Sequence, residues 1–392
     1  MFTGYETGFS LLGNIAQKKL IHLLEADPGV KDLFIEECLM KSLDRIINAS
    51  VLRNHGVDKI FKVEEGCAIS PSTSSYNFFL VRPTSFNAKR IADFVSSQLQ
   101  SRSGSSSGNR PLSKTTVVFV PKRMAVCEMI FEENGVLDGD WLRVEEFDPT
   151  LIALDEDLLS LELPELFSTL YLDGVSTWLM PVAQSVYHLQ SMFGRPRRTY
   201  AIGSGAQQVM TILETLLEDD DRSLGSTRVM DNMKLSSIYL FDRSVDWAAV
   251  FLSGLSYEAL LDEHFGIQAG YCEFPPEVVK KDKVAKVLLN SKDRVYASIR
   301  NNHFSTVFQR LSSGAKSLQS IYDEKKNLTN IAEYKTFVTH ELRDLQARHQ
   351  ALALHIGVCE TILAKKTSLD FEKQLSTEHN IIGGFIRVFV LI

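Results

Sequence analysis

The chain has 392 residues, of which 44% are hydrophobic and 23% charged, which suggests two or three folded domains with ample buried cores. Its 49 acidic and 42 basic residues give a formal net charge of −7, so it lacks the broad positive field with which proteins bind nucleic acid. The five cysteines form no C-x-x-C pair, which excludes the commonest zinc and redox motifs and indicates reduced thiols in the cytosol.

The sequence gives no sign of membrane insertion. Its first residues, MFTGYETGFSLLGNIAQKKL, lack the basic segment and sustained apolar core of a secretory leader. The longest apolar runs fall far short of the roughly 20 residues that a helix needs to cross a bilayer. We therefore expect a cytoplasmic protein that associates with membranes only indirectly, through partners.

The first part of the chain alternates β-rich runs with helical patterns, the order that builds parallel sheets with crossover helices. An N-terminal amphipathic helix, Leu11–Glu25, is expected within residues 1–27. It precedes domain 1, an α/β N-terminal domain with a doubly wound parallel sheet, over residues 28–138. The expected strands are Asp32–Glu36, Lys59–Val63, Tyr76–Val81 and Thr115–Val120, and the expected helices are Ser42–His55, Asn87–Leu99 and Lys122–Asn134. The Ser/Gly tract near 101–108 is typical of a flexible surface loop.

The first half of a second α/β domain is predicted over residues 139–245. Helices are expected at Trp178–Met192 and Ala206–Glu218, and Ser236–Phe241 is predicted as a buried strand that ends at Asp242. The Gly203-Ser-Gly205 segment leaves two interpretations open, a tight turn before a packed helix or a dinucleotide-binding turn without its third glycine.

The chain changes character after Pro276, because none of its 11 prolines lies beyond that residue. The first part of a mainly α-helical domain 3 is predicted over 246–380, with an atypical apolar tail at 381–392. Apolar residues at alternating intervals of three and four predict a long helical hairpin from Phe304 to Leu363, with one seam on each helix. The seams are Phe304, Phe308, Leu311, Ala315, Leu318 and Tyr322, and then Val338, Leu342, Leu345, His349, Leu352, Ile356, Cys359 and Leu363.

Catalytic motifs are largely missing. The chain contains no G-x-x-x-x-G-K-[ST] phosphate loop, and Asp344 stands where H-E-x-x-H requires its second histidine. The densest polar constellation comprises Asp242, Arg243, Asp246, Tyr257, Glu258 and Asp262. The first three suit the catalytic groups of an α/β enzyme, whereas all six suit a network of ion pairs and hydrogen bonds at a structural domain junction. We favour the junction and expect no catalytic residue, no cofactor and no metal ligand.

The same residues carry a family resemblance. The segment IYLFDRSVDWAAVFLSGLSYEALLDEHFGI resembles the signature of the SM (Sec/Munc) family, with its Asp-Arg pair, further aspartate and Tyr-Glu-x-Leu-x-Asp-Glu helix at this spacing. Ala248-Ala-Val250 stands where many members have Thr-Pro-Leu, a departure similar to a vacuolar protein sorting branch of the family. Further similar runs begin at Lys31, Lys286 and Leu354, so the resemblance extends from about Leu11 to Gly384.

The resemblance implies an arch-shaped Sec-like fold and a non-enzymatic regulator of SNARE-mediated docking and fusion in transport to late endosomes and lysosomes. The implied partners are SNARE proteins and a tethering-complex subunit resembling the vacuolar sorting sixteen type, with peripheral attachment to late endosomal and lysosomal membranes. The hairpin is the candidate SNARE-binding surface, because amphipathic helices dock into apolar grooves on rigid helices. Its candidate contacts are Leu345, His349, Leu352 and Ile356. A plain coiled-coil scaffold is the alternative.

The resemblance also predicts a C-terminally truncated chain. Family members continue well beyond the point at which the similarity here stops, near Gly383-Gly384. The unlike tail Phe385–Ile392 is apolar and much too short to span a membrane. We expect the second α/β domain to lack strands and covering helices and to expose an apolar face, with loss of any partner surface on the missing half.

Overall fold

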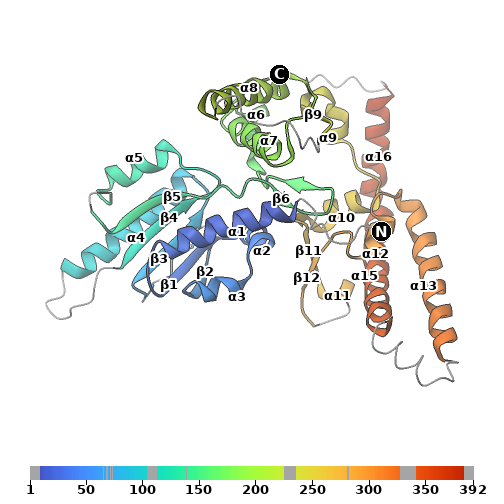
Figure 1. Ribbon diagram of the computed structural model, residues 1–392. Helices are drawn as coiled ribbons and strands as arrows, with labels where there is room; N and C mark the ends of the chain where they lie inside the picture. Colours follow the sequence, from blue (N-terminus) through green and yellow to red (C-terminus); the bar gives the residue numbers. More distant parts are fainter. Residues whose placement is uncertain are drawn as a thin grey trace. The chain divides into compact units, whose positions relative to one another are not determined.

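The computed structural model describes residues 9–64, 66–67, 69–70, 72, 74–103, 113–137, 139–224, 235–279, 282–326 and 341–383 (Figure 1). The chain divides into two units, Met1–Val245 and Asp246–Ile392. The predicted Ser/Gly loop and apolar tail lie mostly outside the described residues, as does the connection between the two hairpin helices. No helix in the described ranges combines the length and the apolar character that crossing a bilayer requires.

The first unit is built on a five-stranded parallel sheet with the strand order β2-β1-β3-β4-β5. The strands are β1 (Lys31–Glu36), β2 (Val57–Val63), β3 (Tyr76–Val81), β4 (Lys114–Phe119) and β5 (Leu142–Glu146). The helices are α1 (Ser10–Glu25), α2 (Glu37–Ile46), α3 (Ala49–Asn54), α4 (Ser85–Ser103) and α5 (Ala125–Glu133). Helices α1 to α3 cover one face and α4 and α5 cover the other (Figure 1). The predicted doubly wound α/β domain is confirmed.

Both faces of the central strands β1, β3 and β4 are buried, which explains their apolar runs. On β1, Leu33 and Ile35 pack under α1 to α3, while Phe34 between them packs with Phe79 under α4. The rings of Phe34 and Phe79 stack with their centroids 4.5 Å apart. A run such as Tyr76–Val81 therefore has no polar face.

One predicted helix of this domain is wrong. The sequence between β1 and β2 forms two short helices instead of a single helix that begins at Ser42. Helix α2 starts six residues after Lys31, at Glu37, and Ser42 is buried within it. Asn48 caps α3, because its side-chain oxygen accepts a hydrogen bond from the Val51 amide at 3.0 Å. The extended backbone at Ile47 and Asn48 separates the two helices.

The rest of the first unit contains a two-stranded parallel sheet, β8 (Arg198–Ile202) with β9 (Ser237–Phe241). Its other elements are β6 (Ile152–Ala153), β7 (Leu159–Ser160), α6 (Glu165–Tyr171), α7 (Leu179–Phe193), α8 (Ser204–Leu224) and the 3-10 turn η1 (Arg243–Val245). Leu240 packs toward α7 and α8. The β9 segment was predicted to be buried, but only the face with Leu240 is covered. On the other face Tyr239 is 59% and Phe241 68% exposed, so the prediction is wrong there. No described element covers that face, although parallel strands are ordinarily covered on both.

The second unit is mainly helical. Its helices are α9 (Trp247–Phe251), α10 (Tyr257–Phe265), α11 (Pro276–Val279), α12 (Arg294–Ile299), α13 (Phe304–Lys326), α15 (Leu342–Lys366) and α16 (Leu369–Ile382). A small antiparallel sheet of β10 (Ile267–Gln268), β11 (Tyr271–Phe274) and β12 (Ala285–Leu288) was not predicted. Helices α13 and α15 pack side by side, as the hairpin prediction requires (Figure 1).

The buried stripes of α13 and α15 depart from the predicted seams. Val307 is fully buried whereas Phe308 is 71% exposed, and on α15 Ile362 is buried whereas Leu363 is 53% exposed. Other predicted seam positions are buried, namely Phe304, Leu311 and Leu318 on α13 and Leu345, Leu352 and Cys359 on α15. The seams are therefore confirmed at these positions and wrong at Phe308 and Leu363.

Candidate functional site

Asp242 lies at the carboxyl end of β9 and is buried within the first unit. Its carboxylate accepts hydrogen bonds from the Gly205 amide at 2.6 Å, from the Ser244 amide at 2.9 Å and from the Tyr171 hydroxyl. A side chain at Gly203, whose φ is +97°, would place its Cβ 2.4 Å from the Asp242 Cβ. The Gly203-Ser-Gly205 segment is thus a tight turn that wraps this carboxylate.

These contacts keep Asp242 ionised. Burial alone raises the pKa of its carboxyl, but the hydrogen bonds from Tyr171, Ser244 and Gly205 outweigh burial and lower the pKa below its ordinary value. Burial and the neighbouring carboxylate together raise the pKa of the Tyr171 hydroxyl, which therefore stays a donor. An apolar pocket of ≈ 450 Å³ lies beside the two residues.

The structure does not join the other predicted residues to Asp242 in one network. Arg243 is exposed, and within the described residues it is not among the donors to Asp242. Asp246 caps α9 by accepting from the Ala249 amide at 3.1 Å. A junction role for these residues remains a prediction.

Tyr257, Glu258 and Asp262 make their contacts inside the second unit. Glu258 pairs with Arg300 at 2.8 Å, and Asp262 accepts a hydrogen bond from the Ile267 amide at 2.7 Å. The first contact joins α10 to the segment between α12 and α13, and the second joins α10 to the start of β10.

Tyr257 belongs to a buried chain of three polar side chains. Its hydroxyl lies 2.7 Å from Nδ1 of His355, and Nε2 of His355 lies 3.1 Å from Oδ2 of Asp293. Burial raises the pKa of the Tyr257 phenol, which therefore keeps its proton. The other oxygen of Asp293 caps α12 through the amides of Val295 and Tyr296. Sequence reasoning missed this link, although an aspartate directly before a helix is a recognisable capping signal.

Two of the four candidate hairpin contacts are buried. Leu345 and Leu352 are 5% and 7% exposed and belong to the core of the second unit. Ile356 is half-buried, and His349 is exposed on α15. Leu352 nevertheless forms the floor of a groove of ≈ 230 Å³ between α12, α13 and α15.

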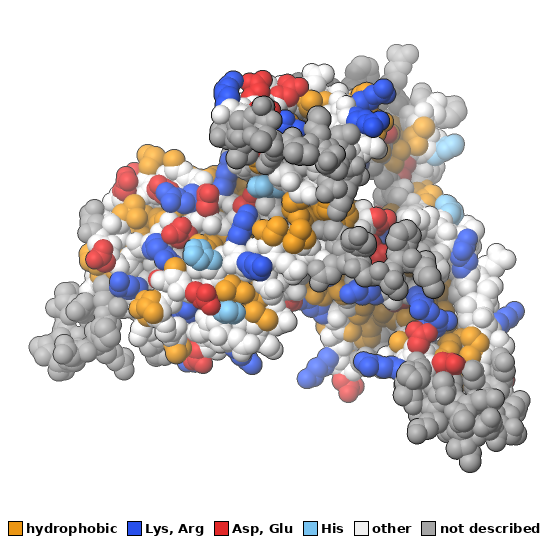
Figure 2. Space-filling model, in the orientation of Figure 1, with side chains coloured by type: hydrophobic (Ala, Val, Ile, Leu, Met, Phe, Trp, Pro, Cys, Tyr) orange, Lys and Arg blue, Asp and Glu red, His pale blue; other side chains and the backbone are white. Residues whose placement is uncertain are grey.

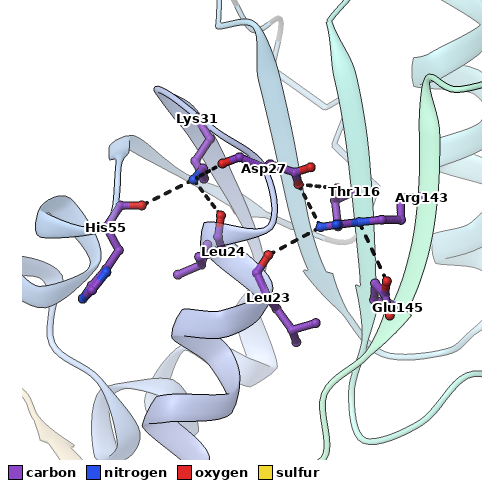
Figure 3. Close-up of polar contacts among 8 residues, drawn as sticks. All are labelled: Leu23, Leu24, Asp27, Lys31, His55, Thr116, Arg143 and Glu145. Carbon is purple, nitrogen blue, oxygen red and sulfur yellow. Dashed lines mark hydrogen bonds and ion pairs between the residues drawn. The ribbon is translucent and has the colours of Figure 1, made fainter.

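The amino edge of the five-stranded sheet carries a second buried network (Figure 3). The Lys31 ammonium donates to the carbonyls of Leu24 at 2.7 Å and Asp27 at 2.9 Å, and burial lowers its pKa. The Asp27 carboxylate accepts from Thr116 at 2.6 Å and from Arg143 at 3.0 Å. These bonds attach the end of α1 to β1, β4 and β5.

The opposite edge of the sheet is where doubly wound folds bind ligands, at the point between β1 and β3 where the strand order reverses. In this chain Glu36, the last residue of β1, accepts a hydrogen bond from Asn87 at 2.9 Å, while the buried Arg82 donates to the Glu162 carbonyl. Polar side chains at this edge of the sheet thus bond to other groups of the chain. Within the described ranges, no group of three or more His, Cys, Asp or Glu side chains is placed to hold a metal ion.

The charges of the described surface are mixed. On the face shown in Figure 2, Lys and Arg side chains are interspersed with Asp and Glu, and the described residues of that face form no continuous basic region.

Comparison with known proteins gives a consistent match. The model of the Sec1 family matches residues 31–387. The chain is 41% identical over 378 residues to human vacuolar protein sorting-associated protein 33B, covering 96% of this chain and 58% of that protein. It is 31% identical to rat vacuolar protein sorting-associated protein 33A, covering 96% of this chain and 62% of that protein. The chain thus spans about three fifths of the length of these relatives.

Solved structures agree in fold. The SM protein Vps45 matches with a TM-score of 0.54 and 15% identity, over 97% of this chain and 66% of its own. The Unc18–syntaxin 1 complex from Monosiga brevicollis matches with a TM-score of 0.53 and 15% identity, over 95% of this chain and 66% of its own. Identities this low show only a shared fold, whereas the family match covers most of the sequence. The chain therefore belongs to the Sec1 family of SM proteins.

Proposed function

We propose that this chain is an SM-type regulator that binds SNARE helices and so controls docking and fusion of vesicles bound for late endosomes and lysosomes. The observation that carries the proposal is the Sec1-family match over residues 31–387. The relatives are vacuolar protein sorting proteins. The fold neighbours include SM proteins solved with the Qa SNARE Tlg2, with an N-terminal peptide of Sed5p and with syntaxin 1.

The geometry of α13 and α15 supports this task. Two long helices packed side by side form a rigid surface, and Phe308 and Leu363 leave apolar side chains exposed on it. Amphipathic helices bind such surfaces through apolar residues repeated every three or four positions. SNARE helices have this character, so the second unit supplies the proposed binding surface.

The proposed role is not enzymatic. The strongest acidic candidate, Asp242, has its carboxylate occupied by two amides and a tyrosine hydroxyl. A general acid or base at neutral pH needs a pKa near 7, whereas the pKa of Asp242 is lowered.

The proposal includes indirect membrane attachment, a tethering-complex subunit of the vacuolar sorting sixteen type as a partner, and the domain boundaries predicted from the sequence.

The test is direct binding of the purified full chain to fluorescently labelled SNARE helices, measured by anisotropy, with helices from several SNARE classes and a scrambled helix as control. We expect saturable binding of at least one SNARE helix and none of the scrambled helix. Absence of binding to every SNARE helix by a folded chain contradicts the proposal. Calorimetry with ATP and GTP tests the non-enzymatic part, and saturable heat with turnover contradicts it.

A further inference from the structure

The two faces of the five-stranded sheet differ in their polar groups at its amino edge. On the α1 side, shown in Figure 3, the Asp27 carboxylate is paired with Arg143 and bonded to Thr116. On the other side, Asp32 of β1 and Asn77 of β3 are 0% and 1% exposed, and among the described residues Oδ1 of each has no hydrogen-bond partner. Buried polar atoms are nearly always bonded, so these two oxygens indicate a group that the chain itself does not supply.

The register of the sheet places the two side chains next to each other. Asp32 pairs with Asn77 across β1 and β3, and Asn77 pairs with Thr115 of β4, which is also buried. Residues two apart on a strand share a face, so Asp32 lies on the face of Phe34, which packs under α4. Neighbouring strands are about 4.8 Å apart, a spacing at which one ion contacts oxygens from both.

Two serines orient the two groups. Ser72 donates to Oδ2 of Asp32 at 2.7 Å, which leaves Oδ1 as the free oxygen of the carboxylate. Ser113 donates its single hydroxyl proton to Gln98 at 2.8 Å, so it accepts the 3.4 Å hydrogen bond from Nδ2 of Asn77. The nitrogen of the Asn77 amide is thereby used, and its oxygen is the free atom. Both free atoms are acceptors, so neither residue satisfies the other.

The Asp32 carboxylate also has no counterion. Lys59 is its neighbour in register on β2 but is exposed, and among the described residues no cationic group lies within ion-pair distance of Asp32. A buried carboxylate is ordinarily paired with a cation or bound to a metal ion. Carboxylate and amide oxygens are ligands of hard cations. A monovalent ion leaves this site neutral, whereas a divalent ion leaves it with an uncompensated positive charge.

We propose that Oδ1 of Asp32 and Oδ1 of Asn77 bind one alkali cation, Na⁺ or K⁺, at the amino edge of the sheet. The ion joins β1 to β3 and binds only the folded chain, because the sheet brings the two oxygens together. It therefore stabilises the first unit by mass action. The expectation from the sequence was no metal ligand, and the proposal departs from it. The proposal does not depend on the proposed function.

The test compares melting temperatures of the full chain in NaCl, KCl and choline chloride at one ionic strength, so that surface charges are screened equally. Choline is too large to enter between the strands. We expect a melting temperature about 3 °C or more higher in NaCl or KCl than in choline chloride, and the larger rise identifies the ion. Equal melting temperatures in all three salts overturn the proposal and indicate a buried water molecule or a shared proton between the two oxygens.

Two variants and a control locate the ion. We expect the salt difference to disappear in Asp32→Asn, because the added amide donates to the Asn77 oxygen and no charge remains. Asn77→Asp places two carboxylates side by side, so we expect a larger salt difference and a further rise with CaCl₂. Asp58→Asn removes the same charge from an exposed residue of β2, and we expect it to behave like the wild type.

Each variant is compared with itself across the salts, so its own change in stability does not affect the result. A full salt difference in Asp32→Asn overturns the site, because the cation then binds elsewhere. If Asp32→Asn does not fold, Asn77→Asp decides alone, and a salt difference equal to that of the wild type overturns the site.

Discussion

Nε2 of His355 lies 3.1 Å from Oδ2 of Asp293, which ties the middle of α15 to the residue that caps α12. His355 is fully buried, and its other ring nitrogen is bonded to the Tyr257 hydroxyl. The three residues lie on three different segments, so this polar chain fixes α10 and α12 against α15. The α12 wall of the groove is held in place by the same link.

We expect His355→Leu to destabilise the second unit by about 2–5 kcal/mol, because it leaves a buried hydroxyl and a carboxylate oxygen without their partner. His349→Leu is the matched control on the same helix, and its exposed position predicts a change within about 0.5 kcal/mol. Urea unfolding followed by circular dichroism measures both. Equal stability of the two variants shows that the buried chain contributes nothing.

The same link predicts a stability change in acid. Burial alone raises the pKa of the Asp293 carboxyl, but hydrogen bonds from His355, Tyr296 and Val295 outweigh it and lower the pKa. A carboxyl with a lowered folded pKa adds stability above its unfolded pKa of about 3.9, and that stability is lost as the pH falls through the folded value. We expect Asp293→Asn, which keeps a capping oxygen, to flatten the fall in melting temperature below about pH 4. Parallel curves for variant and wild type refute this.

Asp242 and its neighbour Arg243 are expected to behave very differently. In Asp242→Asn, an amide replaces a carboxylate that accepts from the Gly205 and Ser244 amides and the Tyr171 hydroxyl, and we expect a loss of about 1–3 kcal/mol. Arg243→Leu changes an exposed side chain, and we expect less than about 0.5 kcal/mol. Thermal unfolding measures the stability of both variants. A large loss of stability in Arg243→Leu contradicts this prediction and indicates that Arg243 is a partner of a buried group.

The open face of β8 and β9 predicts self-association. Tyr200, Tyr239 and Phe241 form an exposed aromatic row, with centroid distances of 4.9 Å and 6.3 Å along it. We expect the double variant Tyr239→Lys and Phe241→Lys to reduce the aggregated fraction, because charge on an exposed strand face opposes association. Met129→Lys, an equally exposed change on α5, is the control. Light scattering after size exclusion measures the fractions, and an equal reduction by both contradicts the role of this face.

The sequence was sufficient to predict elements whose apolar pattern reflects their burial directly. Strands such as Tyr76–Val81 are mostly apolar because both faces are covered, so their positions were predicted within a residue or two. The start of α2 was missed because Glu37 follows the strand directly and no capping side chain marks it. The hairpin seams were correct at positions such as Leu311 and Leu352 but wrong at Phe308 and Leu363, because a heptad pattern does not state how far a helix drifts from it.

The candidate site was less predictable for a different reason. His355 is 62 residues from Asp293 and 98 from Tyr257, so only the folded chain reveals that they meet. The groove likewise depends on a glycine and an arginine of α13 facing α12 and α15, and neither residue type signals such a position. Asp242 was singled out from the sequence, but its partners in the structure are a turn and a tyrosine.

Helix α15 contacts α10, α11, α12, α13 and α16, so it is the shared neighbour of most helices in the second unit. The amides in its buried middle are shielded by elements that are not adjacent to one another in sequence. Their hydrogen exchange therefore requires opening of the whole unit rather than fraying of one helix. A partner that displaced α13 would have to disrupt this cooperative packing. Recognition on this surface therefore favours a ligand that binds without moving the helices.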